Sequence, residues 1–264
     1  MKRLCLSLLL ALLLVLTACG TAEQSPAPGQ SSPPPGRTEE MPDGSVPAGA
    51  QPQDVLTGES GSAAGYTVER QDRSVYNADG TLALSWYYDL VQLTGDTEAA
   101  QAINDSLNRC CDDFFAQNVG NLPMEKQAED VWCNTMDATV TQNGSGLFSV
   151  CLTRSWYMGG VANSDCLGYT YDLATGEALG LAGLTGQDPD TLAATLRELV
   201  KAYMASHPEV EWFGDAAASV DSRSLEDMLF WVDGGEIVLC FSTYDLSPGA
   251  YGPVIIPTGV MAEH

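Results

Sequence analysis

The sequence predicts an α+β fold, in which an antiparallel sheet of hairpins arranged as a meander is covered by two to three helices. One observation is a series of aromatic and β-branched runs separated by glycine turns between residues 65 and 264, which is typical of strands joined by hairpins. The other is a pair of segments whose apolar residues recur every three or four positions, the spacing of a buried helix face. Helices with one apolar face pack on such a sheet and complete the core.

Residues 1–18 are typical of a secretory signal peptide. Lys2 and Arg3 precede an unbroken apolar run that ends in small residues before Cys19. A membrane-spanning helix is the alternative, but it needs about 20 apolar residues, and this run stops before a long polar tract. The stretch Leu16-Thr17-Ala18-Cys19 resembles the lipobox of bacterial lipoproteins, in which the cysteine receives a diacylglyceryl group and becomes the first residue of the mature chain.

The predicted lipid at Cys19 anchors the protein on the extracytoplasmic face of a bacterial cell membrane. Two acyl chains give stable anchoring, since each buried methylene contributes about 0.8 kcal/mol. Residues 19–64 are rich in Pro, Gly and Ser and have almost no large apolar side chain, so they are predicted to form a disordered tether. We expect residues 65–130 to be an N-terminal α+β segment and residues 131–264 a C-terminal domain, together one compact unit.

The first predicted elements are a hairpin and a helix. The turn "NADG" at residues 77–80 lies between two runs rich in Val, Leu, Tyr and Trp, as expected for a hairpin. Thr97 can cap the helix that follows. The apolar face of this helix consists of Ile103, Leu107, Cys111, Phe114 and Phe115.

The middle of the chain is predicted to form a meander. Residues 132–140 and 147–157 flank the turn "QNGSG", and residues 167–173 pair with the continuation of the chain through "LATGEALGL". Gly176 is free to adopt the positive φ that a tight turn needs.

The last predicted elements are a helix and a hairpin. Asp188 and Pro189 mark the start of the helix, and its apolar stripe runs from Leu192 to Met204. A helix-prone stretch follows near residues 224–228. The chain then turns at Asp233-Gly234-Gly235 between two strands, and "VIIP" adds an edge strand.

The chain is strongly acidic, which limits its partners. Without Lys2 and Arg3 it keeps 9 of its 11 basic residues against 35 acidic ones. Nucleic acid is excluded as a partner because phosphate binding depends on clustered Lys and Arg. A cationic protein would be steered toward the domain. Plain solubility is the alternative role for most of these charges.

Six cysteines are candidates for disulfides in an exported domain. They are Cys110, Cys111, Cys133, Cys151, Cys166 and Cys240. Fifteen pairings exist for six cysteines, and the predicted hairpins do not select one. Zinc is the alternative, but the sequence has no C-x-x-C motif, so we expect no metal and no other cofactor.

The glycine pair Gly159-Gly160 is predicted to turn a sheet. A phosphate-binding loop needs a strand, a glycine-rich turn and then a helix. Here the glycines are followed by "VANSDCLGYTYDL", which is typical of a strand.

The segment from Trp132 to the end resembles the RsiV/PdaC-type domain, an extracytoplasmic domain of unknown function. The shared features are an aromatic strand that runs into Gly159-Gly160, a "YDL-x-TG" hairpin within residues 169–176, and a closing stretch at residues 244–253. One departure is Ala162, because members of the family often carry a histidine there.

The resemblance implies a sensor or binding role. The RsiV member is the extracellular part of an anti-sigma factor that recognises lysozyme, and PdaC joins a related region to a peptidoglycan deacetylase. We do not expect the deacetylase activity here, because it needs several histidine ligands for its metal. This chain has only His207 and His264.

We expect no catalytic residue. A Ser or Cys nucleophile needs a base, usually His, within hydrogen-bond reach, and His207 lies at a predicted helix end, where a surface cation is favoured. Paired carboxylates can hydrolyse glycans without histidine, so a carboxylate-based cell-wall hydrolase is the alternative.

The candidate ligand-binding residues lie in the two segments that carry the family motifs. Tyr and Trp are favoured anchors at recognition surfaces, although aromatic residues in strands mostly fill cores. We expect a non-catalytic domain that binds a cationic protein such as lysozyme, or peptidoglycan. A structural envelope lipoprotein is a further alternative. The candidates are Trp156, Tyr157, Met158, Gly159, Gly160, Tyr244, Asp245 and Tyr251.

Overall fold

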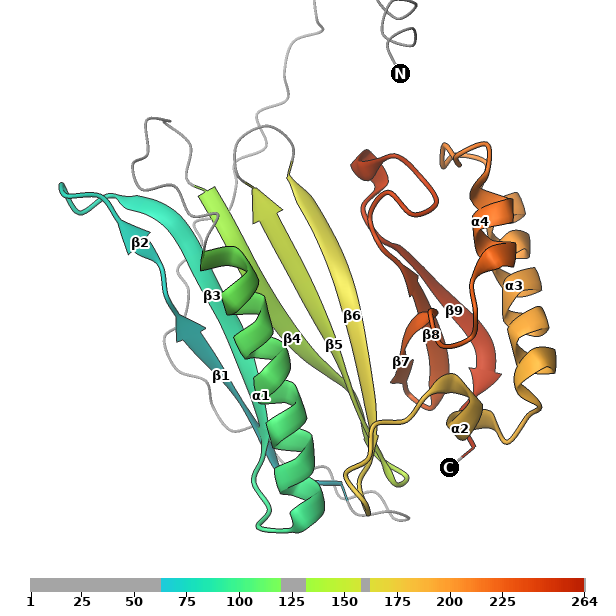
Figure 1. The fold of residues 1–264 in the computed structure, drawn as a ribbon, viewed down its shortest axis with the longest axis horizontal. Coiled ribbons are helices and arrows are strands. Elements are labelled where there is room, and N and C mark those ends of the chain that lie inside the picture. The colour runs from blue at the N-terminus through green and yellow to red at the C-terminus, as the bar shows by residue number, and fades with distance from the viewer. Residues whose placement is uncertain (1–62, 120–131, 158–161, 264) are drawn as a thin grey trace, which may run out of the picture. The chain divides into compact units, whose positions relative to one another are not determined.

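The structure is a computed structural model that describes residues 63–119, 132–157 and 162–263. The predicted signal peptide, Cys19 and nearly all of the predicted tether lie outside these ranges. The described residues belong to one compact unit. Their strands and helices confirm the predicted α+β class (Figure 1).

The first part of the unit is a large sheet with one long helix packed on it (Figure 1). The strands follow the order β1-β3-β4-β5-β6, and β2 pairs with β3. Buried side chains from β3, β4, β5 and β6 form one apolar cluster with Ile103, Leu107 and Phe114 of the helix. The elements are β1 (Tyr66–Asp72), β2 (Val75–Tyr76), β3 (Leu82–Leu93), α1 (Glu98–Val119), β4 (Trp132–Gly144), β5 (Leu147–Tyr157) and β6 (Asn163–Asp172).

The second part is a small antiparallel sheet covered by helices. Its order is β7-β8-β9, and buried side chains of α3 share a second apolar cluster with one face of it. In Figure 1 the small sheet stands between the large sheet and the helices α3 and α4. The elements are α2 (Leu181–Thr185), α3 (Pro189–Ser206), α4 (Ala216–Ser222), β7 (Leu229–Asp233), β8 (Glu236–Phe241), the 3-10 helix η1 (Gly249–Tyr251) and β9 (Val254–Met261).

Several predicted local features are confirmed. The Thr97 side chain accepts a hydrogen bond from the Ala100 amide at 3.1 Å, and the Asp188 side chain accepts one from the Thr191 amide at 3.0 Å, so both helices begin at their predicted caps. Gly234 and Gly235 both have positive φ (56° and 86°), which a two-residue hairpin turn requires.

Three expectations about the fold were wrong. Strands β3 and β4 pair in parallel, because α1 lies between them and carries the chain back to the end where β3 began. The strands form two sheets rather than one. The helix expected near residues 224–228 lies earlier in the chain, as α4. The described residues contain four α-helices, one more than the two to three expected. None of these four helices is long and apolar enough to cross a membrane.

The two sheets meet face to face at an unusually close approach. A Cβ added to Gly168 of β6 would lie 1.8 Å from the Phe230 carbonyl oxygen of β7, so only glycine fits there. Next to it, the Val232 amide donates to Ser149 Oγ of β5 at 2.9 Å, and Thr141 Oγ1 of β4 donates to the Val232 carbonyl at 2.6 Å. Strand β7 is therefore held against the large sheet by side-chain to backbone bonds.

We predict that Gly168→Ala lowers the free energy of unfolding by about 3 kcal/mol, the upper end of the usual cost of overpacking, because the methyl group collides with backbone that cannot move aside. Thermal and urea unfolding measure this change. The matched control is Gly214→Ala, where an added Cβ meets nothing within 4 Å. Equal stability of the two variants would contradict the close packing of the sheets.

Candidate ligand-binding surface

The loop between β8 and β9 presents two of the predicted aromatic residues to solvent. The exposed fractions of Tyr244 and Tyr251 are 53% and 45%. Tyr244 has a φ of 75°, a left-handed conformation that a bulky residue rarely adopts. Its ring lies against Gly249, where an added Cβ would fall 2.3 Å from the ring, and its hydroxyl donates to Asn163 Oδ1 at 3.0 Å. Tyr244 is therefore exposed but fixed.

The base of this loop is tied to the edge of β6. The Thr243 amide donates to Asp165 Oδ1 at 2.6 Å, and the Thr243 hydroxyl donates to the Ser164 carbonyl. Asp245, another predicted site residue, pairs with Arg223 and accepts from the Ser242 amide at 3.0 Å. Asp245 thus helps to hold the shape of the loop.

The segment before α4 lies against this loop and carries exposed acidic and aromatic side chains. The Tyr251 hydroxyl donates to the Glu209 carbonyl at 3.4 Å, and the Phe213 amide donates to the Leu246 carbonyl at 2.9 Å. These bonds bring the segment against the loop. We call the exposed residues of both the tyrosine surface: Tyr244, Tyr251, Phe213, Glu209, Glu211 and Asp215.

The structure brings the two predicted segments together at one end of the large sheet. Trp156, near the end of β5, lies opposite Asn163 of β6, and Asn163 is the residue that accepts the hydrogen bond from Tyr244. Tyr157 lies opposite Cys133 of β4. The predicted residues Met158, Gly159 and Gly160 lie outside the described residues. What is described around them is an antiparallel pair of strands.

Trp156 also belongs to a cluster that the sequence did not reveal. Trp86, Asn134 and Trp156 occupy matching positions on β3, β4 and β5. The Arg154 guanidinium lies 5.1 Å from the centre of the Trp156 ring and 5.3 Å from that of Phe114 in α1, within reach of a cation–π interaction. Burial lowers the pKa of Arg154. Trp86 joins this cluster only through the parallel register of β3 and β4, for which the sequence gives no signal.

Asn134 is the most unusual member of this cluster. Its side chain is 0% exposed, and among the described residues neither its amide nitrogen nor its amide oxygen has a hydrogen-bond partner. The nearby Trp132 Nε1, two residues earlier on the same strand, is buried without a partner as well. Burying such groups unpaired opposes folding.

We predict that Asn134→Leu raises the stability of the domain by about 1–3 kcal/mol, the usual cost of an unsatisfied buried polar group. Leucine has a similar volume and carries no polar atom. The unfolding midpoint in urea measures the change, with Asn143→Leu as the control, because the Asn143 amide is paired to both the nitrogen and the carbonyl of Ala64. A lower midpoint for Asn134→Leu would show that the buried amide is satisfied.

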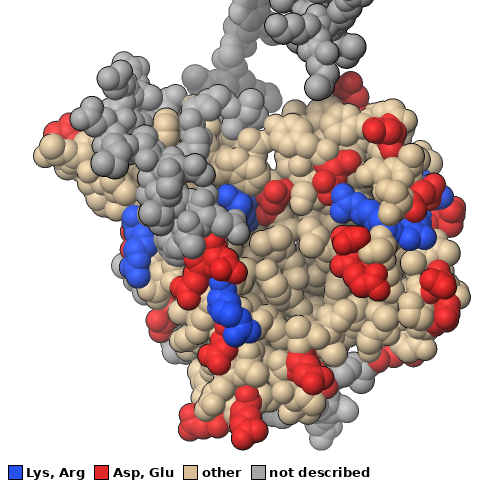
Figure 2. Space-filling model, viewed as in Figure 1, with Lys and Arg blue, Asp and Glu red and all other residues tan. Residues whose placement is uncertain are grey.

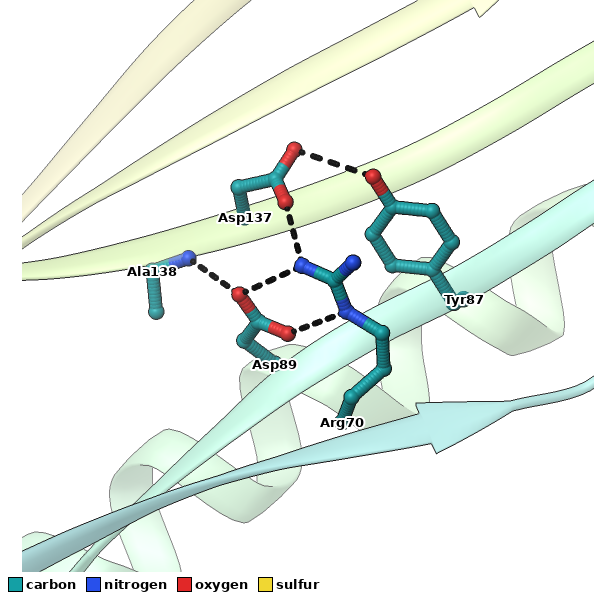
Figure 3. Close-up of polar contacts among 5 residues, drawn as sticks. All are labelled: Arg70, Tyr87, Asp89, Asp137 and Ala138. Carbon is teal, nitrogen blue, oxygen red and sulfur yellow. Dashed lines mark hydrogen bonds and ion pairs between the residues drawn. The ribbon is translucent and has the colours of Figure 1, made fainter. Parts of the chain in front are cut away.

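A pair of carboxylates lies on the face of the large sheet opposite α1. Figure 3 shows the Arg70 guanidinium between Asp89 and Asp137, with the helix behind the sheet. Arg70 Nε donates to Asp89 Oδ1 at 2.9 Å and Arg70 Nη2 donates to Asp137 Oδ1 at 2.8 Å. The hydrogen bond to Asp89 raises the pKa of Arg70. The Tyr87 hydroxyl also donates to Asp137, at 3.5 Å.

These bonds join Arg70, Asp89 and Asp137 into one ion-paired cluster. Both Asp89 oxygens accept hydrogen bonds, one of them also from the Ala138 amide at 3.4 Å. His207 packs against Tyr203. Its ring stacks on the Tyr203 ring, and its Nδ1 donates a hydrogen bond to the Tyr203 carbonyl at 2.8 Å.

The positions of the six cysteines bear on the predicted disulfides and on metal binding. All six disulfide candidates are free thiols in the structure, so no disulfide of the predicted kind is formed in it. Cys110 and Cys111 lie on α1 and Cys133 on β4, whereas Cys151, Cys166 and Cys240 share one buried cluster. In the part of the chain that the structure describes, no three His, Cys, Asp or Glu side chains are grouped so that they could hold a metal ion.

Two solved structures have a similar fold. One is a member of the DUF3298 family from Bacteroides fragilis, with a TM-score of 0.51 and 15% identity over 78% of this chain and 96% of that chain. The other is a DUF3298 family protein from Pseudomonas aeruginosa PAO1, with a TM-score of 0.52 and 13% identity over 74% of this chain and 90% of that chain. DUF denotes a domain of unknown function. No protein-family model and no curated protein matches the chain.

Proposed function

We propose that this protein is a lipid-anchored, extracytoplasmic binding domain without catalytic activity, and that its tyrosine surface captures a cationic protein such as lysozyme. The observation that carries the proposal is the fixed exposure of Tyr244. Its side chain is half exposed and is held by Asn163 and Gly249, and its backbone is strained at φ 75°. The side chain therefore loses little freedom on binding. Preorganised aromatic anchors of this kind are the usual hot spots of protein recognition.

The charge of the domain supports a cationic partner. Glu209, Glu211 and Asp215 are exposed on the segment that contacts Tyr251, and the whole chain has 35 acidic residues against 11 basic ones. Figure 2 shows acidic groups over much of the visible face, while the basic groups are few and have acidic groups beside them. Such a field attracts a positively charged protein and raises its association rate.

The sequence supports the location and the class of partner. The lipobox at Cys19 and the signal peptide predict export, and the RsiV/PdaC-type resemblance of the C-terminal part includes a lysozyme-sensing member. The fold shared with DUF3298 proteins is compatible with this resemblance, but it carries no function by itself.

A cell-wall glycan is the second candidate ligand. Trp156 is only partly buried, and the Arg154 guanidinium lies beside its ring. Trp156 is also opposite Asn163, the residue that binds the Tyr244 hydroxyl. An aromatic face beside hydrogen-bonding groups can receive a sugar ring, so soluble peptidoglycan fragments should be included in every binding assay.

We predict that Tyr244→Ala and Tyr251→Ala each weaken binding of a cationic lysozyme at least tenfold, equivalent to about 1.4 kcal/mol. Titration calorimetry with the full chain measures the dissociation constant. Binding by the unchanged protein should also weaken as salt is raised from 50 to about 300 mM, because added ions screen the acidic surface.

The matched control is Tyr76→Ala, since Tyr76 is 60% exposed but lies on β2 of the large sheet. This variant should bind as well as the unchanged protein. If the unchanged protein retains neither lysozyme nor peptidoglycan fragments, the structural lipoprotein becomes the better account. Soluble products released from peptidoglycan, and lost in Asp89→Asn or Asp137→Asn, would instead establish the hydrolase.

We predict that Cys19→Ala abolishes the lipid anchor. In a bacterial host, the unchanged protein should incorporate a labelled fatty acid and sediment with membranes, whereas the variant should do neither. Ser7→Ala, inside the predicted signal peptide, is the control and should behave like the unchanged protein. Membrane sedimentation and fatty-acid labelling that persist in Cys19→Ala would refute the predicted location.

A further inference from the structure

Three cysteine thiols meet in the apolar space between the two sheets. Cys151 of β5, Cys166 of β6 and Cys240 of β8 are 7%, 4% and 1% exposed, and they share a cluster with Trp231 and Val238. The thiols of Cys151 and Cys240 both interact with the thiol of Cys166. The Cys240 Sγ also lies 3.8 Å from the Cys166 carbonyl oxygen. Cys166 is therefore the central sulfur of the three.

The two sheets approach each other unusually closely beside Cys166. Packed sheets usually lie about 10 Å apart, whereas a disulfide joins Cα atoms about 4.4–6.8 Å apart. Gly168 lies two residues after Cys166, on the same face of β6. A Cβ on Gly168 would fall 1.8 Å from the Phe230 carbonyl oxygen, so the glycine allows the backbone of β7 to approach. The distance between the sheets is thus reduced beside Cys166.

The register of the large sheet disfavours the alternative bond between Cys151 and Cys166. Cys151 lies opposite Gly168, and Cys166 lies opposite Thr153, so the two cysteines are diagonal neighbours. Diagonal partners on adjacent strands have Cα atoms about 7–8 Å apart, beyond the usual range of a disulfide. Cys240 approaches Cys166 from the other sheet, with its Sγ 3.8 Å from the Cys166 carbonyl oxygen.

We propose that Cys166 and Cys240 form a disulfide in the exported protein, which joins β6 to β8, and that Cys151 remains a thiol. The oxidant is a disulfide of an extracytoplasmic thiol oxidoreductase or a small-molecule disulfide. It first forms a mixed disulfide with Cys240 before the sheets close, releasing one of its two thiols. The Cys166 thiolate then attacks Cys240 Sγ and releases the second thiol. In total, two protein thiols are oxidised and one oxidant disulfide is reduced to two thiols.

The bond would also fix the base of the tyrosine surface, a consequence that rests on the proposed function. Cys166 lies directly after Asp165, which binds the Thr243 amide, and Cys240 precedes the same loop. Joining the two cysteines holds Asn163 and Tyr244 in place. Loss of the bond should therefore weaken ligand binding without removing any residue from the surface.

Peptide mapping of the full chain, recovered from bacterial membranes and alkylated before reduction, tests the bond itself. We expect one crosslinked peptide pair that contains Cys166 and Cys240, with Cys151 alkylated. Alkylation of both Cys166 and Cys240 without reduction would overturn the proposal, and so would a crosslink that includes Cys151. None of these outcomes depends on which ligand the domain binds.

Thermal unfolding with and without a reductant gives the second test. The reductant should lower the unfolding midpoint of the unchanged protein and of Cys133→Ser, whose thiol lies outside the cluster. It should leave the midpoint of Cys240→Ser unchanged. A midpoint of the unchanged protein that does not respond to reductant would count against a disulfide.

Discussion

The close contact between β6 and β7 is the constraint on which the rest of the structure depends. Gly168 allows the backbone of Phe230 to approach, and the Ser149 hydroxyl pairs with the Val232 amide beside it. This contact fixes the small sheet on one face of the large sheet, while α1 covers the other face. It also places the end of β8 next to the start of β6, so that Tyr244 can reach Asn163. The candidate surface is therefore assembled by packing between sheets rather than by one continuous segment.

Polar groups in this domain fall into two energetic classes. Arg70 and Asp89, or Arg223 and Asp245, are paired and stabilise the positions of strands and loops. Tyr244, with its left-handed backbone, and Asn134, with its unpaired amide, oppose folding instead. Both of these costly residues lie near the same end of the large sheet, and this is where binding residues were expected. Proteins commonly give up stability at functional sites in this way, which agrees with a binding role for that end.

Much of the fold could be predicted because local rules decide it. Thr97 and Asp188 cap helices through their own side chains, and Gly234 and Gly235 supply the positive φ of a hairpin. The parallel pairing of β3 with β4 could not be predicted, since it depends on where α1 packs. The exposed Tyr244 and Tyr251 could be predicted from their aromatic character, whereas Asn134 could not, because the register of β4 with β5 brings it to Trp156. The grouping of Cys166 with Cys240 is similarly a product of contact between sheets.

A hydrogen-exchange footprint of the full chain with a cationic lysozyme locates the bound surface without any substitution. We predict that the complex slows exchange of backbone amides in residues 209–215 and 242–252, which carry the tyrosine surface, and leaves β1 and β2 unchanged. Protection confined to β1, β2 and the face around Arg70, with the loop after β8 unprotected, would contradict it.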